Sequence, residues 1–196
     1  MNRHRLILLL VVLVGAALAA GLAWRSGVFR PAPPPSAIGG PFQLVDQNGQ
    51  AVDQDVLKGK WNAVFFGFTY CPDLCPTTLH ALDAADGLLG DKGKDLRVVF
   101  ISVDPERDSI KQMHDYLAAQ GFKVETLGLT GTPVQVAQAA KAYRVFYQKE
   151  GTGPDYEMQH TGIVYLMDPK GRFVQPLSPT MTPEQMAAQI QKAMHG

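Results

Sequence analysis

Two uninterrupted apolar runs, each followed by a helical pattern, constrain the fold of this chain more than any other feature. They are "WNAVFFGFT" at residues 61–69 and "LRVVFISV" at residues 96–103. Consecutive apolar side chains without alternation are typical of strands buried on both faces of a sheet. Helix-start residues follow both runs, Pro76 as an expected first helical residue and Asp108 as an expected N-cap. The order predicts an α/β domain with a mixed central sheet.

The rest of the domain continues this alternation and adds shorter pieces. Asn48-Gly49 is a hairpin-turn dipeptide between two short strands. Capping-box patterns begin two further helices at Thr132 and Thr182, and Gly121 is the expected end of the helix after the second apolar run. Strands are expected at residues 145–149, 161–167 and 172–177.

The amino-terminal segment is apolar and uncharged from residue 6 to residue 24. A membrane-spanning helix needs roughly 20 such residues, so residues 6–24 are expected to form a single transmembrane anchor after a short cytoplasmic start, residues 1–5. The alternative is a cleaved signal peptide, because "MNRHR" is a basic start and residues 17–19 resemble a cleavage site. The run is longer than the apolar part of a usual signal peptide, which favours the anchor. The basic residues give a weak bias toward a cytoplasmic amino terminus.

Residues 25–40 are rich in proline and glycine, which is typical of a spacer, and the folded domain is expected at residues 41–196. The basic start lacks the composition of a transit peptide, so a bacterial inner membrane, with the domain in the periplasm, is favoured over a mitochondrial inner membrane. The chain has 18 basic and 18 acidic residues and no basic run. This balance argues against a nucleic-acid partner.

The two cysteines of the chain, Cys71 and Cys75, lie together in the loop after the first apolar run. A disulfide closing so short a loop would remove little chain entropy, so structural stapling explains them poorly. If Pro76 is the first helical residue, Cys75 is the N-cap, and the free backbone N–H groups favour its thiolate. Thiolates bind soft metals and attack disulfides, so both chemistries are open.

The spacing of the cysteines narrows these options. Disulfide oxidoreductases use C-x-x-C, whereas this loop is C-x-x-x-C. Two sulfurs alone cannot complete a four-sulfur zinc site, but two thiolates and one imidazole suit copper, especially Cu(I). His160 precedes a predicted strand, although a histidine at a strand edge is by itself more often structural than a ligand. The other histidines lie near the chain ends or within predicted helices: His4, His80, His114 and His195.

Three stretches of the sequence resemble the Sco/SenC family of copper chaperones for cytochrome c oxidase assembly. They are "GFTYCPDLCPTTL" (67–79), "ISVDPERDS" (101–109) and "YEMQHTGIVYLMDPKGRFV" (156–174). The resemblance implies a thioredoxin-like fold with an inserted β-hairpin, and copper, as Cu(I), Cu(II) or both, bound by Cys71, Cys75 and His160. It also implies that the protein delivers copper to the binuclear copper centre of oxidase subunit II, or keeps the cysteines of that centre reduced. The copper domain of subunit II is the implied partner, with other periplasmic copper chaperones or thiol reductases as further candidates.

Three more residues are candidates to support the ligands without binding copper: Asp73, Asp104 and Gln159. The family usually has an aspartate immediately before the histidine, where this chain has Gln159. A carboxylate there would orient the imidazole or raise its basicity. Glutamine accepts a hydrogen bond but carries no charge, so the affinity for Cu(II) is the property expected to change most. Asp104 is expected to pair with Arg107 and fix the loop that they share.

Other functions need only the cysteines. A thiol–disulfide oxidoreductase and a redox or copper sensor both remain open, and copper loading would itself require reduced sulfurs. The approach to the strand that would face the dithiol, "EMQHT", has no proline, which counts against efficient exchange with many substrates. A thiol peroxidase is disfavoured because Thr69 lies two residues before Cys71, and the P-x-x-x-T-x-x-C motif needs three.

Overall fold

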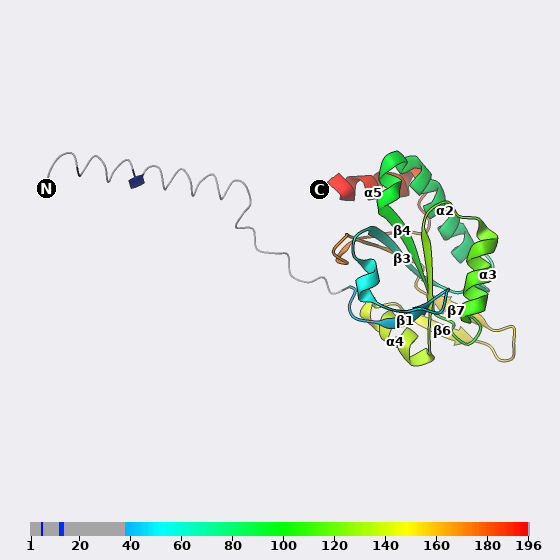
Figure 1. The fold of residues 1–196 in the computed structure, drawn as a ribbon. Coiled ribbons are helices and arrows are strands. Elements are labelled where there is room, and N and C mark those ends of the chain that lie inside the picture. Colours follow the sequence, from blue (N-terminus) through cyan, green and yellow to red (C-terminus); the bar gives the residue numbers. More distant parts are fainter. Residues whose placement is uncertain (1–4, 6–11, 14–37, 196) are drawn as a thin grey trace. The chain divides into compact units, whose positions relative to one another are not determined.

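The computed structural model describes residues 5, 12–13 and 38–195 (Figure 1). The chain divides into two units, Met1–Pro35 and Ser36–Gly196. The expected anchor, residues 6–24, lies outside the described residues except for 12–13, and so does the expected spacer except for 38–40. Among the described residues, no helix combines the length and the apolar character that crossing a membrane requires.

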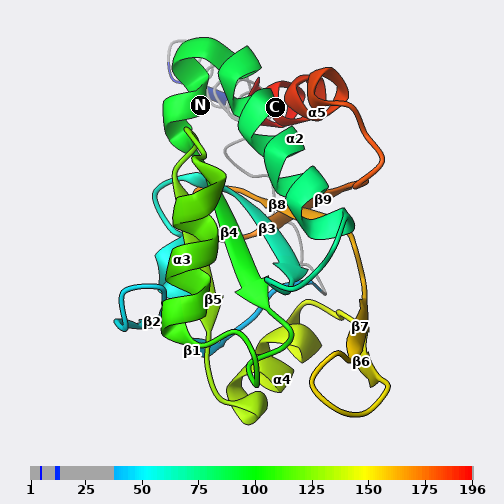
Figure 2. The same ribbon diagram turned by 90° about the vertical axis from the view of Figure 1, so that its right-hand side faces the viewer.

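A seven-stranded mixed sheet forms the centre of the second unit, with the order β2-β1-β5-β4-β3-β8-β9 (Figure 2). Its middle strands β3, β4 and β5 run parallel, and the outer strands pair antiparallel with their neighbours. The two apolar runs form the adjacent strands β3 and β4, as predicted. The strand bounds are β1 Gln43–Asp46, β2 Ala51–Asp53, β3 Trp61–Gly67, β4 Leu96–Ser102, β5 Thr126–Thr130, β8 Val164–Met167 and β9 Phe173–Leu177.

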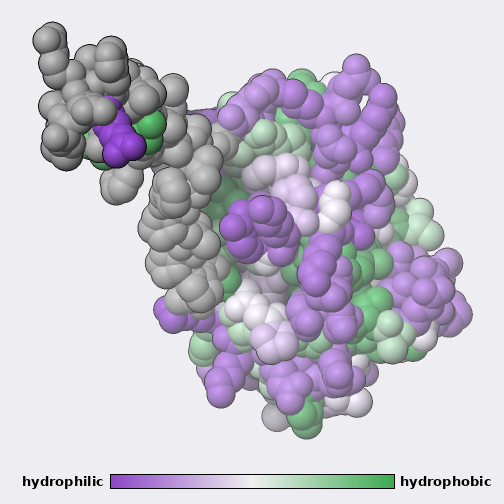
Figure 3. All heavy atoms as spheres, turned by 60° about the vertical axis from the view of Figure 1, so that its left-hand side comes forward, coloured by the Kyte–Doolittle hydropathy of each residue, from purple (hydrophilic) through white to green (hydrophobic). Residues whose placement is uncertain are grey.

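Helices cover both faces of this sheet. The connections β3–α2–β4 and β4–α3–β5 cross the sheet in the same direction, and right-handed crossovers therefore place α2 and α3 on one face. Aromatic contacts follow this division, because Phe65 stacks on Phe100 and Phe100 on Tyr116 of α3, while the next residue, Phe66, packs on Tyr143 after α4. The helices are α2 Leu74–Leu89, α3 Ile110–Gln120, α4 Pro133–Ala142 and α5 Pro183–His195, with short 3-10 turns η1 Gln54–Leu57 and η2 Gly90–Asp95. Hydrophilic side chains spread over the face shown in Figure 3, with hydrophobic ones between them.

Several of the helix-end predictions hold. Thr132 and Gln135 form a capping box at α4, Thr182 and Gln185 exchange the equivalent bonds at α5, and α3 ends at Gly121 in the left-handed conformation. The prediction that Asp108 is the N-cap of α3 is wrong. Ser109 caps that helix, because the Asp108 carboxylate turns into the interior.

A separate hairpin is inserted between α4 and β8. Its strands are β6 Tyr147–Glu150 and β7 Glu157–His160, which pair with each other in a two-stranded sheet. Along β7, Glu157 and Gln159 are exposed, whereas Met158 and His160 are partly buried. This alternation means that one face of the hairpin, including His160, is turned toward the rest of the protein. Figure 2 shows the hairpin beyond the end of β3 at which α2 begins.

Candidate metal centre

The cysteine loop joins the carboxyl end of β3 to α2. The helix begins at Leu74, with Asp73 in the N-cap position, so Cys75 is the second helical residue. The prediction that Cys75 is the N-cap is therefore wrong. Pro76 is the third helical residue, two positions further into the helix than expected. Proline is tolerated there because backbone N–H groups in the first turn have no intrahelical partner. The sulfur of Cys71 instead accepts a hydrogen bond from the backbone N–H of Cys75, at 3.4 Å.

The two cysteines are both free but differ in burial and in proton affinity. Cys75 is fully buried and Cys71 is partly exposed. The pKa of Cys71 is lowered to about 4, first because its sulfur accepts a hydrogen bond from the Cys75 side chain, and also because it accepts hydrogen bonds from backbone N–H groups. The pKa of Cys75 is raised, because that same bond keeps its proton in place and because burial disfavours its charged form. The pair therefore shares one proton, held by Cys75, with Cys71 as the thiolate.

A glycine makes room for the buried sulfur. A Cβ added at Gly67, the last residue of β3, would lie 2.6 Å from the Cys75 Sγ and 2.7 Å from the Phe100 ring. Real Cβ atoms do not approach other atoms so closely. Only glycine at this position lets Cys75 lie against the end of the strand.

A buried carboxylate fastens the start of the same loop. Asp108, which is fully buried, accepts hydrogen bonds from the Thr69 hydroxyl at 2.7 Å, from the Thr69 backbone N–H at 3.2 Å and from the Ser102 hydroxyl at 2.6 Å. These bonds connect the loop after β3 to the end of β4. Sequence reasoning missed the role of Asp108, since its position before a helix suggested a cap.

His160 reaches the cysteines from the end of β7. Its Nε2 atom lies 3.6 Å from the Cys75 Sγ, and its Nδ1 atom lies 3.2 Å from the carbonyl oxygen of Thr161. A carbonyl can only accept, so this second contact places the proton on Nδ1 and leaves the Nε2 lone pair toward the sulfur. The imidazole packs edge-on against Phe68 and Phe65. The ring is thus fixed in position and in tautomer by groups that carry no charge.

Cys71, Cys75 and His160 together form a compact set of donors. One ligand atom from each lies within 4.8 Å of the other two. Three ligands in one plane around an ion, at bond lengths of about 2.2 Å, stand roughly 3.8 Å apart. The set therefore has nearly the size of a three-coordinate metal site, and it is the one such group of histidine, cysteine or acidic residues in the part of the chain that the structure describes.

The three expected supporting residues lie at different depths. Asp73 is exposed at the start of α2, where its carboxylate accepts a bond from the Thr77 hydroxyl. Gln159 is on the outward face of the hairpin, opposite Gln148. Nδ1 of His160 faces the carbonyl oxygen of Thr161. Asp104 is buried and forms the expected ion pair with Arg107, 2.5 Å from its Nε atom.

The other described histidines lie outside this set. His80 packs on Phe122, His114 is beside Asp115, and His195 is beside Lys92. His4 lies outside the described residues.

The comparison with known proteins identifies the family. A family model described as SCO1/SenC matches residues 30–195. The chain belongs to the SCO1/SenC family. "Protein SCO1 homolog 1, mitochondrial" of Arabidopsis thaliana is 45% identical over 141 residues, which are 71% of this chain and 42% of that protein. This chain therefore spans less than half the length of that relative.

Two solved structures of Sco proteins with copper bound share the fold. Arabidopsis thaliana ScoI with copper bound is 39% identical, with a TM-score of 0.76 over 81% of this chain and 98% of that one. Bradyrhizobium japonicum ScoI with copper bound is 45% identical, with a TM-score of 0.72 over 80% and 99%. These matches confirm the predicted thioredoxin-like fold, with a central mixed sheet flanked by helices, and the Sco/SenC resemblance.

Proposed function

We propose that this protein is a metallochaperone that binds copper through Cys71, Cys75 and His160 and serves cytochrome c oxidase assembly. It delivers copper to the binuclear copper centre of oxidase subunit II, or keeps the cysteines of that centre reduced. The observation that carries the proposal is the convergence of the three ligand atoms within 4.8 Å in a member of this family. Two sulfurs and one imidazole are soft donors that suit copper. The copper-bound Sco relatives lend further support.

The unequal exposure of the ligands supports a direction for copper transfer. Cys75 is fully buried, whereas Cys71 and His160 are only partly buried. An incoming thiolate of the partner therefore approaches copper from the side of Cys71 and His160. Ligands are exchanged one at a time, so these two leave first and Cys75 last.

The proposed cellular arrangement follows the amino-terminal pattern. Residues 1–5 lie in the cytoplasm, residues 6–24 anchor the chain in a bacterial inner membrane, and residues 25–40 are the spacer. Residues 41–196 then act in the periplasm. The uncharged apolar run at residues 6–24 supports this arrangement. Labelling of single cysteines placed on either side of the run, in intact cells, tests it.

Metal analysis of residues 36–196 under reducing conditions tests the copper site. One copper per chain is expected in the native sequence, with markedly weaker binding in Cys71→Ser, Cys75→Ser and His160→Ala. Circular dichroism establishes that each variant is folded. Unchanged copper binding in folded His160→Ala would refute the three-ligand site. A transfer assay to the copper domain of subunit II tests delivery separately, and copper that stays on this protein would refute it.

The cysteine pair also supports a second candidate, thiol–disulfide exchange. Cys71 is a partly exposed thiolate beside a buried Cys75. Its sulfur attacks a partner disulfide, forms a mixed disulfide and expels one partner thiolate. Cys75, once deprotonated, then attacks the Cys71 sulfur and expels the second, so the partner gains two electrons and a Cys71–Cys75 disulfide forms. Turnover on a subunit II disulfide that persists in His160→Ala would favour this function over copper delivery.

A further inference from the structure

His160 depends on a hairpin that is not part of the main sheet. Strands β6 and β7 pair only with each other, so no ladder of backbone hydrogen bonds connects His160 to β3 or to the cysteine loop. Side chains must therefore hold the hairpin at the distance that places His160 beside Cys75. The contacts of Arg107 provide such a link.

Arg107 joins the loop after β4 to the residue that precedes β7. Its Nε atom donates to the Asp104 carboxylate at 2.5 Å, and its Nη1 atom donates to the backbone carbonyl of Tyr156 at 2.9 Å. The guanidinium also lies over the Tyr156 ring, 3.7 Å from its centroid. The Tyr156 hydroxyl returns to Asp104 at 2.5 Å, which closes a ring of three side chains.

This arrangement is shielded from water. Asp104 is 3% exposed and Tyr156 is 6% exposed. Charge-assisted hydrogen bonds and cation–π contacts are stronger in such surroundings than on an open surface. A second ion pair to the hairpin, Lys149 with Glu106, is exposed and therefore contributes less. The buried ring of contacts is consequently the stronger of these two polar links to the hairpin.

We propose that Arg107 is a positioning residue that holds His160 at the copper site, acting through Tyr156 and Asp104. The inference rests on the proposed function, because it assigns Arg107 a role in copper affinity without any contact with copper. Tyr156 immediately precedes β7, and β7 runs extended to His160 at its end. Anchoring Tyr156 thus limits where the imidazole can lie.

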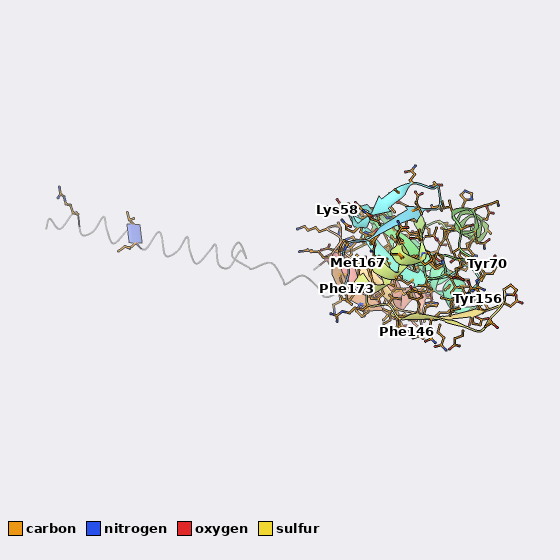
Figure 4. The ribbon with its side chains drawn as sticks, turned by 90° about the horizontal axis from the view of Figure 1, so that it is seen from below. Lys58, Tyr70, Phe146, Tyr156, Met167 and Phe173 are labelled. Carbon is orange, nitrogen blue, oxygen red and sulfur yellow. The ribbon has the colours of Figure 1, made fainter. Side chains whose placement is uncertain are left out.

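A second route for the effect of Arg107 must be separated from this one. The guanidinium lies 5.0 Å from the ring centroid of Tyr70, the neighbour of Cys71, and Tyr70 and Tyr156 lie on the same side of the unit (Figure 4). If Arg107 acts through Tyr70, its loss would disturb the cysteine loop rather than His160. A double-mutant cycle with His160 distinguishes the two routes, because only the first requires the imidazole.

The experiment measures Cu(I) affinity of the full-length protein in detergent, by competition with the chelator bicinchoninic acid. Arg107→Gln is expected to lower the affinity about 10-fold, the lower end of the usual range for groups that support a ligand. In the His160→Ala background the same change is expected to alter it by less than about twofold. Arg172→Gln is the matched control, since Arg172 also pairs with an aspartate, Asp168, in the turn between β8 and β9.

An equal loss in both backgrounds, or no loss in either, would overturn the proposal. Tyr156→Phe removes only the bond to Asp104 and is the second variant if Arg107→Gln does not fold. It is expected to weaken binding by a smaller factor, again only when His160 is present.

A copper-free measurement separates this inference from the proposed function. In Arg107→Gln, hydrogen exchange of the backbone amides at residues 157–161 is expected to accelerate, while exchange in β3 and β4 stays unchanged. Unchanged exchange in the hairpin would refute the fastening role, whatever the protein does with copper. If the exchange accelerates but the native protein binds no copper, the fastening stands and the proposed function fails.

Discussion

The Nε2 atom of His160 lies 3.6 Å from the sulfur of Cys75, although 85 positions separate the two residues in the sequence. Two structural features bring them together. The buried sulfur of Cys75, at the start of α2, lies against Gly67 at the end of β3. The hairpin turns one face of β7, which carries His160, toward the rest of the protein. The contacts around these two residues lead to four predictions.

The first prediction concerns the reactivity of Cys71. A depressed pKa keeps the thiolate populated at low pH, and the thiolate is the form that reacts with alkylating agents. The rate of Cys71 modification by iodoacetamide is therefore expected to stay nearly constant from neutral pH downward and to fall with a midpoint at about pH 4. Peptide mapping after a pulse of reagent measures this rate.

Cys75 serves as the internal control for that experiment. Because it is buried and keeps its proton, it is expected to remain unmodified in the folded protein. A midpoint near 9, the ordinary value for cysteine, would contradict the hydrogen bonding found around Cys71.

The second prediction concerns Gly67. Gly67→Ala places a methyl group against the Cys75 sulfur and the Phe100 ring, so one of them must shift. Overpacking of this kind is expected to lower the free energy of unfolding by about 1–3 kcal/mol and to weaken copper binding. Urea denaturation and copper competition measure the two effects.

Gly87→Ala is the matched control for this substitution. Gly87 lies in α2, and a Cβ there meets nothing within 4 Å. Alanine is expected to stabilise the exposed helix by about 0.5–1 kcal/mol. A Gly67→Ala variant as stable as the native protein would show that the sulfur has room to move.

The third prediction concerns Asp108. Its carboxylate accepts bonds from two groups of Thr69 and from the Ser102 hydroxyl. In Asp108→Asn one acceptor oxygen becomes a donor, and a buried donor is left facing another donor. The free energy of unfolding at neutral pH is expected to fall by about 1–3 kcal/mol.

An exposed aspartate provides the comparison for Asp108. Asp55 pairs with Lys58 at the surface, and Asp55→Asn is expected to change stability by less than about 0.5 kcal/mol. Equal effects of the two substitutions would argue against a fastening role for the buried carboxylate.

The fourth prediction concerns the tautomer of His160. Its Nδ1 atom faces the Thr161 carbonyl, so the neutral ring is expected to carry its proton on Nδ1 in the metal-free protein. Nitrogen-15 chemical shifts of the two ring atoms, recorded at alkaline pH, measure this directly. A proton found mainly on Nε2 would mean that the carbonyl does not orient the ring.

Local patterns in the sequence were sufficient for much of the fold. The apolar runs at residues 61–69 and 96–103 predicted β3 and β4, because consecutive apolar residues indicate a strand that is buried on both faces. Thr132 and Gly121 marked helix ends, because capping involves groups only a few residues apart. β5 had no comparable signal: its Gly128, a weak strand former, packs tightly against Met113 and Leu117.

Cys71, Cys75 and His160, which converge in the structure, were also named together from the sequence, since they stand in motifs that resemble a known family. By itself, however, the sequence assigned the wrong caps near the site. Cys75 became the second residue of α2 and Asp108 turned inward, because each position depends on contacts with distant segments. The tertiary structure alone decided that a carbonyl orients His160 and that Arg107 reaches the hairpin. Such contacts join segments far apart in sequence, and only the topology of the folded chain brings those segments within bonding distance.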